Sequence, residues 1–243
     1  MNRALASDEF LNFPLLDWKM GSYQCTPDCQ GKQCGDGDGC GGSCCECGEV
    51  INDSRDSNTY QTVQIGAQCW MAENLAYDNG CSTVQWENGS DEGWCGSHPE
   101  CVSGKGLLYQ WSAMMTGGTN EGAQGICPVG WHIPTDQEWC TLRKTLGSDT
   151  PCDHVGWGWN GTGTAISLGG SSGYDATWPR SRECTGEFLP CSNVTHKELA
   201  YSSSECEDSS QAWTGMYWNT DHTDVWHGCY DKCKAGTVRC IMN

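Results

Sequence analysis

The sequence has few basic residues and no long apolar run. Thirteen Lys and Arg stand against 31 Asp and Glu, so the 243-residue chain has a formal net charge of −18. Proteins that bind nucleic acid need a Lys/Arg surface to neutralise phosphates, so we expect no nucleic-acid partner. No stretch approaches the roughly 18–20 apolar residues of a membrane span. The chain also opens without a basic, apolar signal peptide.

Cysteine is abundant instead. Twenty Cys, 32 Gly and a mean hydropathy of −0.56 describe a loop-rich chain that relies on crosslinks. Such a density of cysteines persists in oxidising compartments. We therefore expect an extracellular or cell-surface protein, whose export signal has been removed or lies upstream of Met1.

Composition divides the chain into three regions. Residues 1–24 are an N-terminal arm without cysteine, residues 25–48 are a Cys/Gly-rich knot, and residues 58–243 are a larger module, with 52–58 as a polar linker. Six apolar side chains of the arm form what we call the assembly arm: Phe10, Leu11, Phe13, Leu15, Leu16 and Trp18.

One helix is predicted directly from local signals. Thr135 followed three residues later by Glu138 is a capping box, in which each side chain satisfies a backbone N–H of the first turn. Trp139 and Leu142 then follow at helical spacing. The pattern predicts a helix over 135–146.

Four motifs, in order, resemble those of a known secreted bacterial family. They are TVQIGAQCWMAENLAY (62–77), LLYQWSAMM (107–115), CPVGWHIPTDQEW (127–139) and GTVRC (236–240). They resemble the Fibrobacter succinogenes major paralogous domain over about residues 58–243. The resemblance implies an α+β, C-type-lectin-like fold with two helices and a twisted antiparallel sheet. We place the helices near 107–116 and 135–146, and strands near 62–70, 213–219, 223–230 and 236–242. The resemblance also implies a disulfide between Cys127 and Cys240.

The remaining cysteines allow several pairings. The knot resembles a small secreted module in which six cysteines make three bridges: Cys25, Cys29, Cys34, Cys40, Cys44 and Cys47. Cys45 is then the odd one, and we expect it to bridge to the larger module. Cys229 and Cys233, and Cys184 and Cys191, are near enough in sequence to close small loops. The irregular spacing and the absence of a nearby histidine favour disulfides over zinc in the knot.

Nine of the thirteen tryptophans are assigned to two groups. Those inside the family motifs are predicted to lie in the core: Trp70, Trp111, Trp131 and Trp139. Those in glycine-rich or polar segments are candidates for exposure, where a large ring usually marks a contact: Trp157, Trp159, Trp178, Trp218 and Trp226.

The segment just before the closing GTVRC strand is the candidate ligand-binding face. In lectin-fold proteins diversified by retroelements, this position carries the variable ligand-contacting residues. The resemblance places nine residues there: Tyr217, Trp218, Asn219, Asp221, His222, Asp224, Trp226, His227 and Tyr230. Aromatic and small polar side chains together suit adaptable recognition. A strand pair with an exposed polar-aromatic edge would give the same pattern without any ligand.

We expect neither catalysis nor a cofactor. Formylglycine-generating enzymes share a similar fold and depend on a reactive cysteine pair, but disulfide pairing accounts for every cysteine here. His222, Asp224 and His227 could converge on a metal, yet no obligatory metal is expected. Glycosylation is permitted at four N-x-[ST] sequons: Asn52, Asn88, Asn160 and Asn193.

Two functions remain in competition. In the first, the chain is a structural subunit of an extracellular filament or surface layer, and its partners are copies of itself. The assembly arm would then pack on a neighbour, since burying each large apolar side chain contributes roughly 1.5–3 kcal/mol and Pro14 favours an extended arm. In the second, the chain is a surface-displayed adhesin or ligand-binding module for a protein or glycan. The assembly function ranks first on sequence.

Overall fold

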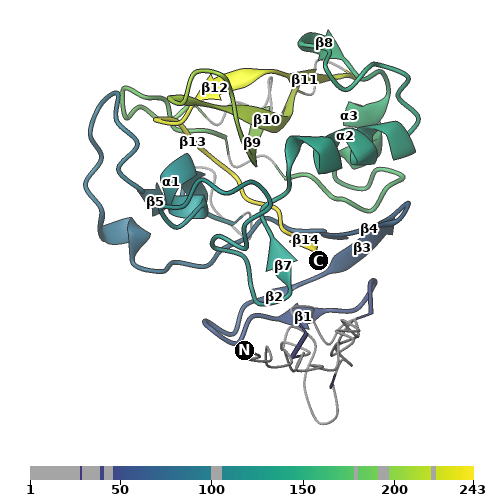
Figure 1. Ribbon diagram of the computed structural model, residues 1–243, viewed down its shortest axis with the longest axis horizontal. Helices are drawn as coiled ribbons and strands as arrows, with labels where there is room; N and C mark the ends of the chain where they lie inside the picture. The colour runs from purple at the N-terminus through teal and green to yellow at the C-terminus, as the bar shows by residue number, and fades with distance from the viewer. Residues whose placement is uncertain are drawn as a thin grey trace, which may run out of the picture.

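The computed structural model describes residues 28, 39–40, 46–99, 106–177, 180–190, 197–219 and 223–243, with only the backbone at 197 and 216–219. The assembly arm and most of the cysteine knot, Cys45 included, lie outside these residues. Within the described part, named strands pair antiparallel in four small sheets and three short α-helices accompany them, an α+β architecture (Figure 1). No helix in this part is long and apolar enough to cross a membrane.

The largest sheet has five strands. Its two long strands, β9 (Lys197–Glu205) and β10 (Gln211–Asn219), pair along most of their length. On its other edge β10 pairs with β11 (Val225–His227) and β12 (Cys229–Asp231), and β11 pairs with β8 (Gly156–Gly158). The strands expected near 213–230 are therefore present, and β8 and β9 are additional.

Strand β9 gave no alternating signal because both of its faces are covered. Leu199 and Tyr201 belong to one core cluster, while Ala200 between them belongs to another. Ser202 and Ser203, which follow, are also fully buried. A strand without a solvent face lacks the alternation of apolar and polar residues that identifies half-buried strands.

The first family motif and the two residues directly after the last motif meet in a second sheet. Its strands run in the order β3 (Thr62–Ile65), β4 (Gln68–Met71), β14 (Ile241–Met242) and β7 (Trp131–His132). The single strand expected over 62–70 is a hairpin, because Gly66 adopts a left-handed φ of 63° at the turn. Figure 1 shows β14 beside β4 and the C-terminus.

The helix expected over 107–116 is shorter than predicted, because its first part is a strand and helix begins only at Trp111. Leu108–Gln110 forms β6, which pairs with β5 (Cys95–Gly96) and β13 (Ala235–Gly236) in a three-stranded sheet. Only one helical turn follows, α1 (Trp111–Met114). Residues 108–110 are a strand because β6 is hydrogen-bonded to a partner strand on each edge, and this pairing outweighs the local preference for helix.

The linker expected at 52–58 is the turn of an ordered hairpin between β1 (Ile51–Asn52) and β2 (Thr59–Tyr60). Buried Asp53 pairs with Arg55, whose Nη2 lies 2.6 Å from Asp53 Oδ2. Arg55 Nη1 donates to the carbonyl oxygen of Ile126 at 2.9 Å. These contacts fasten the hairpin to the larger module.

Helix α2 (Asp136–Thr145) begins as predicted. The capping box is confirmed, with Thr135 Oγ1 accepting from the Glu138 N–H and the Glu138 side chain accepting from the Thr135 N–H. Trp139 of this helix packs against Trp70, with ring centroids 4.7 Å apart. The two remaining helices are the short α3 (Thr162–Ile166) and the 3₁₀ turn at Cys81–Thr83.

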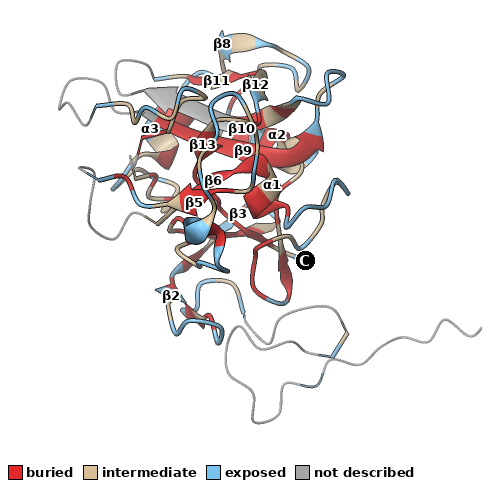
Figure 2. Cartoon of the chain, turned by 90° about the vertical axis from the view of Figure 1, so that its left-hand side faces the viewer, coloured by how far each residue is buried: buried red, intermediate tan, exposed pale blue. Residues whose placement is uncertain are grey.

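Buried residues gather around β9, β10, α1 and α2, while the surrounding loops are exposed (Figure 2). The four tryptophans assigned to the core, Trp70, Trp111, Trp131 and Trp139, are all buried, which confirms that prediction. Helix α2 covers one face of the long sheet beside α3, and β6 and α1 lie toward the other (Figure 1).

Six disulfides join the described residues: Cys47–Cys69, Cys81–Cys95, Cys127–Cys240, Cys140–Cys152, Cys184–Cys233 and Cys206–Cys229. The expected Cys127–Cys240 bridge is among them. The local pairings suggested for Cys229 with Cys233 and Cys184 with Cys191 are wrong. An extended strand advances about 3.3 Å per residue, so β12 carries Cys233 away from Cys229. Cys47 does not pair within the knot as expected, because it is bonded to Cys69 of β4.

Candidate functional site

Three aromatic side chains line up across the strands of the large sheet, and we call them the aromatic row: Trp157 on β8, Trp226 on β11 and Tyr230 on β12. Trp157 lies opposite Trp226 in the strand register. Trp226 meets Tyr230 edge-on, with ring centroids 5.0 Å apart. Trp157 is 38% exposed and the other two are half-buried. The row therefore offers aromatic surface to solvent.

The backbone fixes the position of Trp226. Its neighbours Val225 and His227 are fully buried, so alternation along β11 directs Trp226 to the opposite face. A Cβ at Gly228 would lie 2.5 Å from the Trp226 ring, so the indole rests over a backbone position that only glycine leaves clear. The ring is thus held before any ligand arrives.

The nine residues predicted as a ligand-binding face do not all lie together. Trp226 and Tyr230 belong to the row, and Asp224 is half-buried beside Thr223, whose Oγ1 lies 3.0 Å from Asp224 Oδ1. Tyr217 lies opposite Trp226 in the register of β10. Only backbone is described for Tyr217, Trp218 and Asn219, and Asp221 and His222 fall outside the described residues.

Two of the side chains expected at the surface are in the interior. His227 is fully buried because it points inward between Trp213, which stacks on it at 4.8 Å, and Trp159 at 6.1 Å. Trp159 is also fully buried, since the Arg143 guanidinium lies 4.1 Å above its ring. Placing either at the surface was wrong. Trp178 lies outside the described residues.

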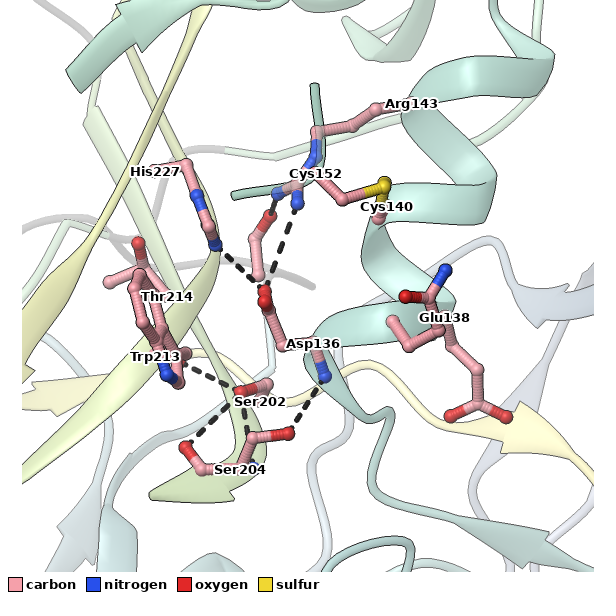
Figure 3. A network of polar contacts seen from close by, with 12 residues as sticks. Asp136, Glu138, Cys140, Arg143, Cys152, Ser202, Ser204, Trp213, Thr214 and His227 are labelled. Atoms are coloured by element: carbon pink, nitrogen blue, oxygen red, sulfur yellow. Dashed lines mark hydrogen bonds and ion pairs between the residues drawn. A yellow bond between two sulfur atoms is a disulfide. The ribbon is translucent and has the colours of Figure 1, made fainter. Parts of the chain in front are cut away.

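Beneath the row, a buried polar network joins β11 to the start of α2 (Figure 3). His227 Nε2 lies 2.8 Å from Asp136 Oδ1, and His227 Nδ1 lies 2.7 Å from the carbonyl oxygen of His154. A carbonyl only accepts, so Nδ1 of His227 donates to His154, and Nε2 faces the Asp136 carboxylate. Arg143 Nη2 lies 3.8 Å from the same carboxylate oxygen, and burial lowers the pKa of Arg143 to about 10 against the attraction of Asp136.

Serines of β9 extend this network. Ser204 Oγ accepts from the Asp136 N–H at 2.9 Å, and Ser202 Oγ donates to the carbonyl oxygen of Trp213 at 3.0 Å. The contacts connect α2, β9, β10 and β11 in one buried unit (Figure 3). Its effect is to fix β11, and with it Trp226, against the helix.

A polar cavity of about 550 Å³ lies where β12 ends. It is lined by Gly89, Asp91, Cys184, Ser209, Ser210, Asp231, Lys232 and Cys233. The sequence gives no sign of it, because its walls come from four separate segments, two of which are joined by the Cys184–Cys233 bridge. No local pattern in the sequence could have revealed it.

Other candidate positions take a structural or peripheral place. Two clusters combine an aspartate with two cysteines, Asp78 with Cys81 and Cys95, and Asp231 with Cys184 and Cys233. Both cysteine pairs are oxidised, so their sulfurs are not thiolate ligands. Among the sequons, Asn88 and Asn160 are exposed, Asn52 is half-buried in β1, and Asn193 lies outside the described residues.

Comparison with known proteins gives one match. The model of the Fibrobacter succinogenes major domain matches residues 63–242, which include all the strands from β4 to β14 and the three helices. Neither a curated protein nor a solved structure matches the chain.

Proposed function

We propose that this chain, which belongs to the Fibrobacter succinogenes major domain family, is a secreted, non-enzymatic surface domain that binds a glycan through the aromatic row. The proposal includes the lectin-like architecture that the family resemblance implies. In its support, β4 and β14 from opposite ends of the module pair directly, and α2 packs on the long sheet.

Export to an oxidising compartment follows from the chemistry of the cysteines. The six bridges among the described residues join segments up to 113 positions apart. Disulfides of this kind persist outside the cell and are rare in the reducing cytosol. We therefore place the protein outside the cell or on its surface.

The exposed aromatic row is the observation that carries the binding function. The ring of Trp226 is held over Gly228 and against Tyr230, so little side-chain entropy is lost when a ligand covers it. Indole rings offer a flat face with negative electrostatic potential, against which the C–H groups of a sugar ring stack. Trp157, opposite Trp226 on the next strand, extends that platform along the sheet. An extended glycan fits such a row.

What supports a non-enzymatic role is the structural use of the buried and half-buried polar groups. His227 contacts the Asp136 carboxylate through Nε2 and the His154 carbonyl oxygen through Nδ1. Glu138 is engaged in the cap of α2 and with His132. These groups hold elements together, which is their function in this proposal.

The test is binding of the intact protein to a panel of immobilised plant and microbial polysaccharides. We expect at least one polysaccharide to retain the protein, and Trp157→Ala to weaken this binding by about thirtyfold, since truncating an aromatic anchor costs roughly 2 kcal/mol. Leu168→Ala, at a residue that is 61% exposed, is the matched control and should bind as the parent does.

Thermal melting of each variant checks that the fold is intact. The glycan proposal fails if no polysaccharide retains the protein, or if Trp157→Ala binds as well as Leu168→Ala. If the protein binds an immobilised surface protein and none of the polysaccharides, the proposal moves to a protein target.

Self-assembly is the second candidate, and the apolar sequence of the assembly arm favours it. Six large apolar residues fall within 10–18, flanking Pro14, and a partner that buried them would be held firmly. The arm lies outside the described residues, so this candidate rests on sequence. In it, residues 8–20 occupy a groove on a neighbouring copy, in a filament or surface layer.

Deletion of residues 1–20 with the disulfides intact tests assembly. Electron microscopy and sizing chromatography should show polymers of the full chain and folded monomers of the truncated chain. Polymers that persist without the arm, or a full chain that is monomeric, would exclude this mode of assembly.

A further inference from the structure

The polar cavity at the end of β12 has the properties of a second binding site, separate from the aromatic row. Its volume of about 550 Å³ lies within the range of small-molecule sites. Two carboxylates, of Asp91 and Asp231, and two hydroxyl side chains, of Ser209 and Ser210, line it. A bare ion needs far less space, so the cavity suits a polar molecule.

Two walls of the cavity are fixed to each other in advance. Gln110, fully buried, accepts from the N–H groups of Glu92 at 3.1 Å and Trp94 at 2.9 Å. Its amide nitrogen donates to the carbonyl oxygens of Ser90 at 2.8 Å and Cys233 at 3.0 Å. One side chain thus joins the Asp91 segment to the segment after β12. A site that is rigid before binding loses less entropy when the ligand arrives.

Both carboxylates keep acceptor capacity. Asp91 Oδ1 accepts from Ser112 Oγ at 2.7 Å, and Asp91 Oδ2 accepts from the Ser112 N–H at 2.9 Å. Asp231 Oδ1 accepts from Gln211 Nε2 at 2.8 Å. An ionised carboxylate has about four acceptor positions, so these bonds orient each group and leave positions for another donor.

The charges around the cavity are unbalanced. Lys232 supplies the ammonium of the lining, but its Nζ is paired with Glu205 and lies 3.7 Å from the centroid of the Trp111 ring. In the part of the chain that the structure describes, no Lys or Arg forms an ion pair with Asp91 or Asp231 within 4 Å. The lining therefore carries two carboxylates, half-buried Asp91 and exposed Asp231, and one ammonium that is already paired with Glu205, so its net charge favours a cationic occupant.

We propose that this cavity binds a primary ammonium group on a small polar ligand, held by the carboxylates of Asp91 and Asp231 with the hydroxyls of Ser209 and Ser210 beside it. An ammonium has three N–H donors for these acceptors, and charge-assisted hydrogen bonds are the stronger kind. Two sources carry this chemistry, an amino sugar and a lysine side chain.

Calorimetric titration of the intact protein distinguishes the sources. The probes are glucosamine, N-acetylglucosamine and lysine N-methylamide. We expect at least one amine to bind, and N-acetylglucosamine to bind at least about tenfold more weakly than glucosamine if the amino sugar is the source, because acetylation removes the charge. Tighter binding of lysine N-methylamide would assign the site to a peptide side chain.

Variants connect the binding to the cavity. Asp91→Asn and Asp231→Asn preserve shape and should each weaken amine binding by about tenfold or more. Asp153→Asn, at an exposed carboxylate elsewhere, is the matched control and should leave it unchanged. Trp157→Ala should also leave it unchanged, so failure of the glycan proposal and failure of this one are separable. Thermal melting establishes that each variant is folded.

Acid pH provides an independent readout. Burial raises the pKa of Asp91, although hydrogen bonds from Ser112 and the charge of Lys232 oppose the shift. Amine binding should therefore weaken as pH falls through that raised pKa, and less so in Asp91→Asn. The proposal is overturned if neither amine binds at millimolar concentration, or if the double variant Asp91→Asn/Asp231→Asn binds with parental affinity.

Discussion

Replacing Gly215 by alanine should separate helix α2 from the long sheet. Gly215 lies on β10 directly beneath Trp139, and a Cβ at this position would be 2.0 Å from both Cε2 and Nε1 of the indole. Carbon atoms in contact normally lie about 3.5–4.0 Å apart. The ring is rigid and packed against Trp70, so it cannot move aside alone, and the helix has to shift.

The cost follows from two opposing effects. Overpacking a core typically destabilises by about 1–3 kcal/mol. Replacing glycine within a strand by alanine recovers roughly 0.5–1 kcal/mol through the unfolded chain. We therefore expect Gly215→Ala to lower the free energy of unfolding by about 1–2 kcal/mol. In a Trp139→Leu background the ring is gone, and the same change should be neutral or mildly stabilising.

Urea unfolding of the four proteins, with disulfides intact, measures this coupling. The double-mutant cycle should give a favourable interaction of about 2 kcal/mol between the two substitutions, as expected for residues in contact. Arg143 Nη1 also donates to the Gly215 carbonyl oxygen, so the shift should extend to the network below Trp226. An equal cost of Gly215→Ala in both backgrounds, or no cost at all, would refute the packing argument.

Three further predictions follow from the same region of the fold. Burial opposes the charge on His132, but Glu138 outweighs it and raises the His132 pKa above 6.5, while His132 and the Thr135 N–H lower the Glu138 pKa below 4.5 against burial. The stability that protonated His132 contributes is complete below pH 6.5 and is lost as pH rises through its folded-state pKa. The stability that ionised Glu138 contributes is complete above pH 4.5 and is lost as pH falls through its folded-state pKa. Thermal melting should therefore show the pair contributing most between pH 4.5 and 6.5, and Glu138→Gln should flatten that dependence. Thr135→Ala removes the helix cap and should cost about 1 kcal/mol by urea titration, whereas an unchanged midpoint would mean that the cap is not used. The Cys127→Ala/Cys240→Ala variant opens a loop that the other bridges shorten to roughly 50 residues, so its free energy of unfolding should fall by about 4 kcal/mol. A fall of less than about 1 kcal/mol would contradict the loop-closure argument.

Local signals in the sequence predicted the parts of the fold that depend on neighbours in the chain. The cap of α2 could be identified because Thr135 and Glu138 act on each other within one turn. The motif tryptophans could be assigned to the core. The hairpin after Ile65 was missed because a single glycine turn is easily taken for part of one strand.

Long-range contacts decided what the sequence could not show. Trp159 sits in a glycine-rich segment that suggested exposure, yet Arg143 from α2 covers it. The sequence placed His227 on a surface face because its partner, Asp136, is 91 residues away in the chain. The cavity depends on Gln110 and on a bridge between Cys184 and Cys233. None of these pairings leaves a local pattern.

Nuclear magnetic resonance of the indole N–H groups tests the central claim most directly, since it reports on single tryptophans without any substitution. The intact protein would be titrated with an oligosaccharide derived from the polysaccharide that it binds. Binding through the aromatic row predicts that the Trp157 and Trp226 signals shift with saturation, while those of buried Trp70 and Trp131 stay in place. A bound oligosaccharide that leaves the Trp157 and Trp226 signals unmoved would contradict the account.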